Sequence, residues 1–189
     1  MPWKSVLLGT ALSAAAFLAA GRVFSGDEPS GPEVDASKPG PEHQRLRAYE
    51  GTWNMTGTTK SGGMSLTGRC TARLILGGRF LETDGEFSIG GTTYRTMEIV
   101  GYDNRRDQYV QVSVGDSSTT VTEREGQYDA GKKRIVFQGA EPGASGMERR
   151  WRSTWTDVAG DTFRREAYLD YGPGTGEKRV TEETFTRAR

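Results

Sequence analysis

The sequence has almost none of the residues that metal centres and nucleophilic active sites require. Its 189 residues include one cysteine and one histidine. This pair cannot form an internal disulfide, a zinc site built from Cys and His, or an iron site with two histidines. Any Ser-His-Asp or Cys-His mechanism would have to use this one histidine. We therefore expect no bound metal and no cofactor.

The sequence also lacks an excess of charge of either sign. Lys plus Arg and Asp plus Glu number 25 each, so the formal net charge is zero. Domains that bind nucleic acid or an anionic membrane surface carry a clear basic excess. We expect no nucleic-acid partner, and membrane contact only through an uncleaved N-terminus.

Glycine, in contrast, is abundant, with 26 residues against 7 prolines. The glycines separate short runs that are rich in Thr, Val, Tyr and Phe, which are residue types that favour strands. This combination is typical of an all-β protein with many tight turns.

The first forty residues differ from the rest of the chain. Lys4 supplies a positive charge before an apolar stretch over residues 6–20, which is shorter than the ~20 residues of a membrane-spanning helix. We interpret residues 1–25 as a signal peptide or N-terminal anchor that sends the protein to the periplasm or cell envelope. Residues 26–40 are rich in Pro, Gly, Ser and acidic residues, and predict a disordered linker.

Residues 41–189 are expected to form one domain. Pro41 begins a short helix of about two turns, with Leu46 and Tyr49 on one face. Ten runs with strand character follow, each bounded by turn residues, at 51–59, 65–76, 79–88, 92–102, 107–114, 118–128, 133–139, 148–157, 161–170 and 178–187. Consecutive strands joined by hairpins form an antiparallel meander, which loses its free edges by closing into an up-and-down barrel.

Several motifs of this domain resemble the bacterial family of unknown function numbered 1579. They are Gly-Pro-Glu-His43, Gly51-Thr-Trp53, Ile75-Leu-Gly-Gly-Arg-Phe-Leu81, Gly101-Tyr-Asp-Asn104, Gly126-Gln-Tyr-Asp129 and Thr184-Phe-Thr-Arg187. The resemblance implies a lipocalin-like, or calycin-like, β-barrel with no established activity. Gly51-Thr-Trp53 is also similar to the Gly-x-Trp of the first lipocalin strand. That likeness implies that Trp53 closes one end of the barrel under a basic residue of the last strand, Arg187 or, in its place, Arg189.

Three residues or motifs have catalytic or metal-binding interpretations, which we weigh against simpler ones. Gly115-Asp116-Ser117 resembles the nucleophile block of some esterases, but the only histidine, His43, lies on the leading helix, so we interpret the block as a hairpin turn. Beside the linker, His43 is expected to be exposed to solvent rather than to ligate haem or a metal. Cys70 alternates with apolar residues and is expected to be a buried core thiol.

The segment Gly172-Pro-Gly-Thr-Gly176 resembles a phosphate-binding loop. Glu177 interrupts the required Gly-Lys-Ser/Thr sequence, and no helix follows to present backbone amides. We interpret this segment as a hairpin.

Cations and aromatic side chains interleave at one place in the sequence. Trp151, Ser153 and Trp155 alternate with Arg150 and Arg152, so the two sets lie on opposite faces of a strand. Charged side chains are more stable in water than inside a barrel, so the tryptophan face is expected to point inward.

We assign Trp151, Trp155 and Arg165 to a ligand site, with Arg165 expected beside an inward-pointing carboxylate. The candidates for this carboxylate are Glu166, Glu182 and Glu183. A solvated outer face with core tryptophans is the alternative interpretation of the same segment.

Three functions remain open from the sequence. The first is an exported barrel that binds a small, mostly apolar molecule without catalysis. The second is a filled barrel that serves as a structural or protein-interaction module of the cell envelope. The third is an enzyme with a carboxylate and an arginine in the mouth of the barrel.

Overall fold

The structure, a computed structural model, describes residues 35–60, 63–142 and 148–189. The predicted signal segment 1–25 and most of the predicted linker 26–40 therefore lie outside the described residues. Within the described part, residues 35–40 lie beside the hairpin that follows β4 (Thr92–Asp103), where the Asn104 amide donates to the carbonyl oxygens of Asp35 (3.3 Å) and Lys38 (2.9 Å). No helix among the described residues has the length and apolarity to cross a bilayer.

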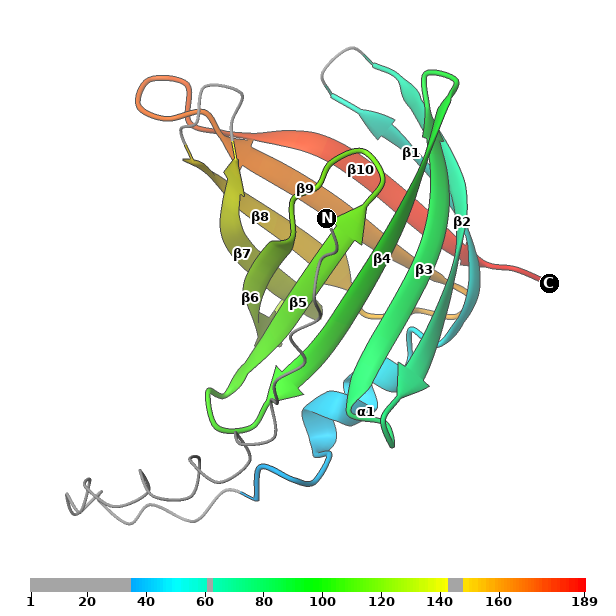
Figure 1. The fold of residues 1–189 in the computed structure, drawn as a ribbon, viewed down its shortest axis with the longest axis vertical. Helices are drawn as coiled ribbons and strands as arrows, with labels where there is room; N and C mark the ends of the chain where they lie inside the picture. The colour runs from blue at the N-terminus through cyan, green and yellow to red at the C-terminus, as the bar shows by residue number, and fades with distance from the viewer. Residues whose placement is uncertain (1–34, 61–62, 143–147) are drawn as a thin grey trace, which may run out of the picture. The chain divides into compact units, whose positions relative to one another are not determined.

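Ten antiparallel strands of the described chain form a closed barrel (Figure 1). The strands are β1 (Gly51–Thr59), β2 (Ser65–Ile75), β3 (Phe80–Ile89), β4 (Thr92–Asp103), β5 (Gln108–Gly115), β6 (Thr122–Asp129), β7 (Arg134–Pro142), β8 (Glu148–Thr156), β9 (Thr162–Asp170) and β10 (Glu177–Arg187). Each strand pairs with its neighbours in the sequence, and β1 pairs with β10 to close the barrel. The predicted up-and-down barrel is confirmed.

The largest difference from the predicted strand ranges is at the start of β6. We expected this strand from residue 118, but it begins at Thr122, which pairs with Ser113. Residues 116–121 form an exposed turn instead, in which the Ser118 hydroxyl accepts a hydrogen bond from the Thr120 backbone N–H at 2.8 Å. Local hydrogen bonds of this kind compete with a β-ladder.

Helix α1 (Pro41–Arg47) and the turn after it cover one end of the barrel (Figure 1). Leu46 and Tyr49 are buried there. The Tyr49 hydroxyl donates to the carbonyl oxygen of Thr156 at 2.8 Å, and the Tyr109 hydroxyl donates to the Glu42 carboxylate. Hydrogen bonds to strands on both sides therefore hold this cap over the barrel end.

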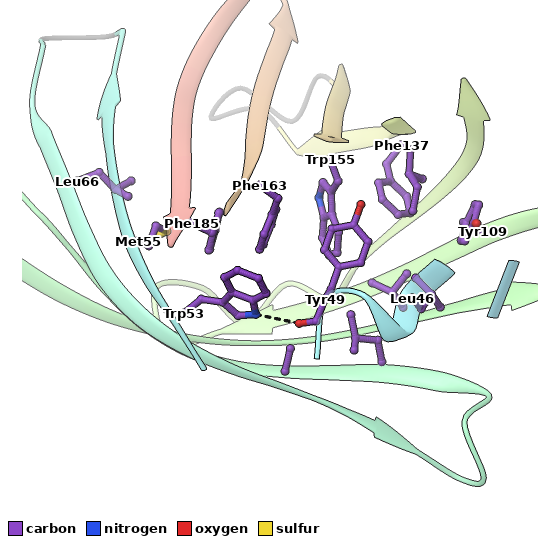
Figure 2. Packing of buried hydrophobic residues seen from close by; sticks show 14 residues of the cluster. Leu46, Tyr49, Trp53, Met55, Leu66, Tyr109, Phe137, Trp155, Phe163 and Phe185 are labelled. Carbon is purple, nitrogen blue, oxygen red and sulfur yellow. Dashed lines mark hydrogen bonds between the residues drawn. The ribbon is translucent and has the colours of Figure 1, made fainter. Parts of the chain in front are cut away.

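An aromatic core fills the end of the barrel next to α1 (Figure 2). The Phe163 ring meets both Trp53 (4.8 Å between ring centroids) and Tyr49 (5.1 Å) edge-on, and Trp155 meets Phe137 at 5.4 Å. Edge-to-face contacts of this kind add to the stabilisation that burial itself provides. This end of the barrel is therefore closed and tightly packed.

Further from α1, small residues replace the aromatic rings at inward-facing positions. Gly57, Gly68, Gly85 and Gly139 each pair with neighbours whose side chains face the interior, such as Leu66 for Gly57. Of these four glycines, Gly85 lines a space inside the barrel that no side chain fills. At the other three, atoms of neighbouring residues lie so close that an added Cβ would collide with them.

Candidate functional site

The unfilled volume is a cavity of about 350 Å³ inside the barrel. One wall comes from β1, β2, β3 and β10 and carries the apolar residues Met55, Leu66, Phe87, Ile89 and Phe185. The same strands also contribute charged residues, Arg69, Glu86 and Glu183. The facing wall is polar and comes from β4 to β7, with Glu98, Gln111, Ser113, Arg124 and Glu141. The cavity therefore presents an apolar surface and a hydrogen-bonding surface to the same space.

Strand register brings the polar side chains together. Glu98 lies opposite Ser113, and Gln111 lies opposite Arg124. The Arg124 guanidinium donates to the Glu141 carboxylate at 3.0 Å. Residues from four neighbouring strands thus form one continuous polar band.

An ion pair crosses the barrel at the level where the aromatic core ends. Arg165 on β9 donates from Nη2 to Oε1 of Glu98 on β4 at 2.9 Å, and its Nε lies 3.9 Å from Oε2 of Glu183. β9 and β4 are five strands apart in either direction around the barrel, so they face each other across the interior. The guanidinium also lies 4.4 Å from the Trp155 ring centroid, which makes the ion pair the floor of the cavity.

Several buried polar atoms of the cavity wall have no hydrogen-bond partner within the described chain. They are Nε2 and Oε1 of Gln111, Oε2 of Glu98 and Nε of Arg124. The Gln111 side chain belongs to a residue that is only 1% exposed. Buried polar groups in folded proteins almost always have partners, so these atoms indicate that water or a ligand occupies the cavity.

The model of the family described as "Protein of unknown function (DUF1579)" matches residues 38–187. The chain belongs to this family. No curated protein matches the sequence. The description of DUF1579 leaves the activity open, so any function rests on the geometry of the barrel.

Two of the three residues assigned to the ligand site line the cavity of this DUF1579 barrel. Trp151 and Arg165 are lining residues. Trp155 lies below them in the aromatic core, 2% exposed, and meets Tyr49 edge-on at 5.7 Å. The floor formed by Arg165 separates Trp155 from the cavity.

Trp53 and Arg187 lie together at the α1 end of the barrel, away from the cavity. They are register partners across the β1–β10 seam. The Arg187 guanidinium lies 4.2 Å from the Trp53 ring centroid and donates to the Glu50 carbonyl oxygen at 2.7 Å. Trp53 in turn donates from Nε1 to the Tyr49 carbonyl oxygen at 2.8 Å (Figure 2).

The expectation that His43 is exposed was wrong. The residue is 5% exposed, its Nδ1 accepts a hydrogen bond from the Gly40 backbone N–H at 3.0 Å, and its ring meets Tyr102 edge-on at 5.9 Å. Burial lowers the pKa of its imidazole below the usual value. A cap packed against the barrel end buries the face of α1 that carries His43, which the linker beside it did not reveal.

The other charged residues near Trp151 divide between the two faces of the barrel. Arg152 lies outside, where it binds both oxygens of the Glu177 carboxylate (2.8 and 2.6 Å) and lies 3.8 Å from the Tyr168 ring centroid. Among the three glutamates considered as partners of Arg165, Glu183 faces it from inside. Glu166 instead binds Arg179 at 2.7 Å.

Sequence reasoning did not identify Glu98, Gln111 or Arg124 as site residues. Period-two alternation places each of them on the same face as a buried neighbour, such as Val100 for Glu98. That signal was available, but the partner of Glu98 is 67 residues away in the sequence, and only barrel closure brings the two side chains together.

The site contains one thiol, Cys70, and its reactivity is restricted. Burial raises the pKa of the Cys70 thiol to about 11, so it stays protonated at neutral pH. The described residues contain no group of three or more His, Cys, Asp and Glu side chains placed to hold a metal ion.

Proposed function

We propose that this protein binds one small, mostly apolar molecule inside the barrel. The observation that carries the proposal is the cavity of about 350 Å³, whose wall holds the buried amide of Gln111. This amide has no hydrogen-bond partner in the part of the chain that the structure describes. Ligand sites have volumes of about 300 to 1,000 Å³, with a largely apolar lining and a few polar groups that orient the ligand. The volume is a little more than twice that of the ~150 Å³ apolar cavity that accepts benzene.

The cavity argues against the filled barrel that the sequence left open. Interiors of filled domains are packed as densely as organic crystals, with few voids larger than a water molecule. The cavity of about 350 Å³ is far larger than such a void.

One observation favours an enzyme as a second candidate function. Glu183 lines the cavity, and burial raises the pKa of its carboxyl above the usual value. Carboxyl groups with raised pKa values are frequent among general acids and bases. An enzyme would release a chemically altered molecule, whereas a binding protein releases the same molecule that it bound.

We further infer that the protein acts outside the cytoplasm. Support comes from residues 1–25, whose positive charge and following apolar stretch are typical of export signals.

The experiment for the binding function is native mass spectrometry of the protein purified from its own host. A bound small molecule at a stoichiometry of one supports the proposal. The variant Ala167→Phe places an aromatic ring in the cavity, because Ala167 is a buried lining residue, and is expected to lose the bound molecule. Thr186→Phe adds the same ring at an exposed position of β10 and serves as the control.

Two results would oppose the proposal. The first is protein that carries no small molecule from any growth condition. The second is equal retention of the molecule by folded Ala167→Phe and Thr186→Phe. Recovery of a chemically altered molecule after incubation would favour the enzyme instead.

A further inference from the structure

We propose that the ligand of this cavity carries a positively charged amino group on its apolar body. The inference rests on the proposed binding function and concerns the class of ligand. Its basis is an excess of carboxylates over guanidinium groups in the cavity wall, together with a carboxylate oxygen and an amide oxygen that have no hydrogen-bond partner among the described residues.

The excess of negative charge is located at one place in the wall. The charged lining residues are three arginines and five glutamates. Glu141 is matched by Arg124, Glu166 by Arg179, and the exposed Glu86 lies opposite Arg69 in the β2–β3 register. Glu98 and Glu183 remain, and they share the single guanidinium of Arg165.

The shared guanidinium satisfies the two carboxylates unequally. It approaches Glu98 Oε1 at 2.9 Å but remains 3.9 Å from Glu183 Oε2. Glu98 Oε2 is buried and has no hydrogen-bond partner within the described chain, and the same is true of Gln111 Oε1. An ammonium group has three N–H donors and no acceptor, which fits two such oxygens. The donors of the same wall that lack a partner among the described residues, Gln111 Nε2 and Arg124 Nε, are left for water or for an acceptor elsewhere on the ligand.

A raised pKa makes Glu183 the carboxyl of the site that holds a proton more readily than usual. Glu183 faces Arg165 on β9, Glu98 on β4 and the thiol of Cys70 on β2, and burial raises the pKa of its carboxyl. Binding of an ammonium ion favours the ionised form of this carboxyl. We therefore expect any proton that Glu183 holds to leave for the solvent as the ligand enters, which keeps the charge of the site balanced.

The rest of the ligand contacts the apolar wall, which lies across from Glu98 and includes β10, the strand that carries Glu183. Met55, Leu66 and Phe185 line that side and are buried residues. A ligand that pairs its ammonium group with the carboxylates would place a hydrocarbon or aromatic body against them. The site therefore favours an amphipathic amine over a neutral or acidic molecule of the same size.

The test compares three probes that share one phenyl ring and differ in their polar group: phenethylamine, phenethyl alcohol and hydrocinnamate. Isothermal titration calorimetry of the full chain measures each affinity. We expect the amine to bind about tenfold more tightly than the alcohol, as a charge-assisted hydrogen bond gives, and the carboxylate to bind most weakly. Titrations of the amine in buffers of different ionisation enthalpy should show proton release.

Glu183→Gln removes the excess charge and keeps the shape of the side chain. We expect it to lower the amine affinity about tenfold, to abolish proton release, and to leave the alcohol affinity unchanged. Glu125→Gln is the matched control, because Glu125 lies outside the cavity, where it pairs with Arg106. This control should change neither affinity.

The possible results separate the two proposals. If the alcohol binds as tightly as the amine, or if Glu183→Gln weakens both probes equally, the amine inference is wrong and the binding function stands. If none of the three probes binds, the binding function itself fails. If the Glu183 variant does not fold, the unaltered protein still tests the inference, through the relative affinities of the three probes and the proton release on amine binding.

Discussion

Trp53 is the side chain on which the closed end of the barrel depends most. It is fully buried, its ring lies between Phe163 and the Arg187 guanidinium, and its N–H has a backbone acceptor. We predict that Trp53→Ala lowers the free energy of unfolding by about 3–5 kcal/mol, because it removes a large core side chain and leaves a void. Urea denaturation measures this loss.

Trp151→Ala provides a comparison within the same barrel. Trp151 is only partly buried and borders the cavity, so its removal enlarges an existing space. We expect a loss of about 1 kcal/mol. Equal losses for the two variants would contradict the assignment of Trp53 to the core and of Trp151 to the site.

His43 predicts a pH dependence of stability. Burial lowers the pKa of its imidazole, so the folded protein binds a proton less readily than the unfolded chain, whose histidine titrates near pH 6.5. The contribution of His43 to the free energy of unfolding is fully present above that pH. It decreases as the pH falls from about 6.5 toward the lower pKa of the folded state. Because His43 is the only histidine in the chain, His43→Asn should flatten the curve between about pH 7 and 5.5. If the stability of His43→Asn changes with pH as steeply as that of the unaltered protein, His43 is not the source of the pH dependence.

Glu183 predicts the opposite dependence. Its raised pKa means that the folded protein holds this proton more tightly than the unfolded chain does. The associated stability is present below the unfolded pKa and is lost as the pH rises through the folded one. We therefore expect Glu183→Gln to be more stable than the unaltered protein at pH 7 in the absence of ligand, as measured by thermal unfolding. A less stable variant would mean that the ionised carboxylate is well compensated in the empty barrel.

At the scale of residues, the sequence predicts which side chains point inward better than it predicts their partners. Alternation places Trp151 and Trp155 on one face, and the structure confirms that both point inward. The height of each residue along the barrel axis depends on how neighbouring strands are staggered. The alternation of apolar and polar residues carries no information about this stagger. Trp155 therefore lies below the floor and Trp151 above it.

At the scale of elements, the β1–β10 seam tolerates no side chain at Gly57. A Cβ atom there would collide with the carbonyl oxygen of Glu182 and lie 3.1 Å from the Cα atom of Glu183. We predict that Gly57→Ala lowers the free energy of unfolding by about 1–3 kcal/mol, because backbone atoms of β10 have to move. Chemical denaturation checks the value.

Gly131→Ala is the control for this substitution. An added Cβ at Gly131 would lie 3.5 Å from its nearest neighbour, an Asp129 carboxylate oxygen, which is ordinary contact. We expect a change within about 0.5 kcal/mol, or a small gain from the reduced entropy of the unfolded chain. A Gly57 variant as stable as the Gly131 variant would show that the seam can relax.

Strands were predictable because each turn has a local signal. Gly90 and Gly91 have positive φ values of 57° and 87°, in the turn where the sequence places two glycines between strand-like runs. The start of β6 was not predictable, since residues 118–121 have strand-like composition but hydrogen-bond within a turn.

At the scale of the whole molecule, the existence of the barrel followed from the count of consecutive hairpins, but the cavity did not. Its lining combines residues from strands that are far apart in the sequence, such as Leu66 on β2 and Trp151 on β8, which come together only when the barrel closes. The ion pair of Arg165 with Glu98 depends on the number of strands, because ten strands place β4 directly across from β9.

Export is a prediction for the whole chain. We expect fractionation of host cells to recover the protein outside the cytoplasm, and deletion of residues 2–25 to retain it in the cytoplasm, because these residues have the charge and apolar stretch of an export signal. Recovery of the full-length, unaltered chain in the cytoplasmic fraction would contradict the prediction.

The β1–β10 seam has a consequence for the connectivity of the domain. The Ala188 backbone N–H donates to the Thr52 carbonyl oxygen at 2.8 Å, so the last strand ends beside the beginning of the first. All other ladders join strands that are adjacent in the sequence. A circular permutant that links Arg189 to the residues before α1 and opens the Gly90–Gly91 hairpin would keep every ladder while changing which strand is first. Such a permutant is expected to retain the cavity and its ligand, since the arrangement of strands around the barrel does not depend on where the chain is cut.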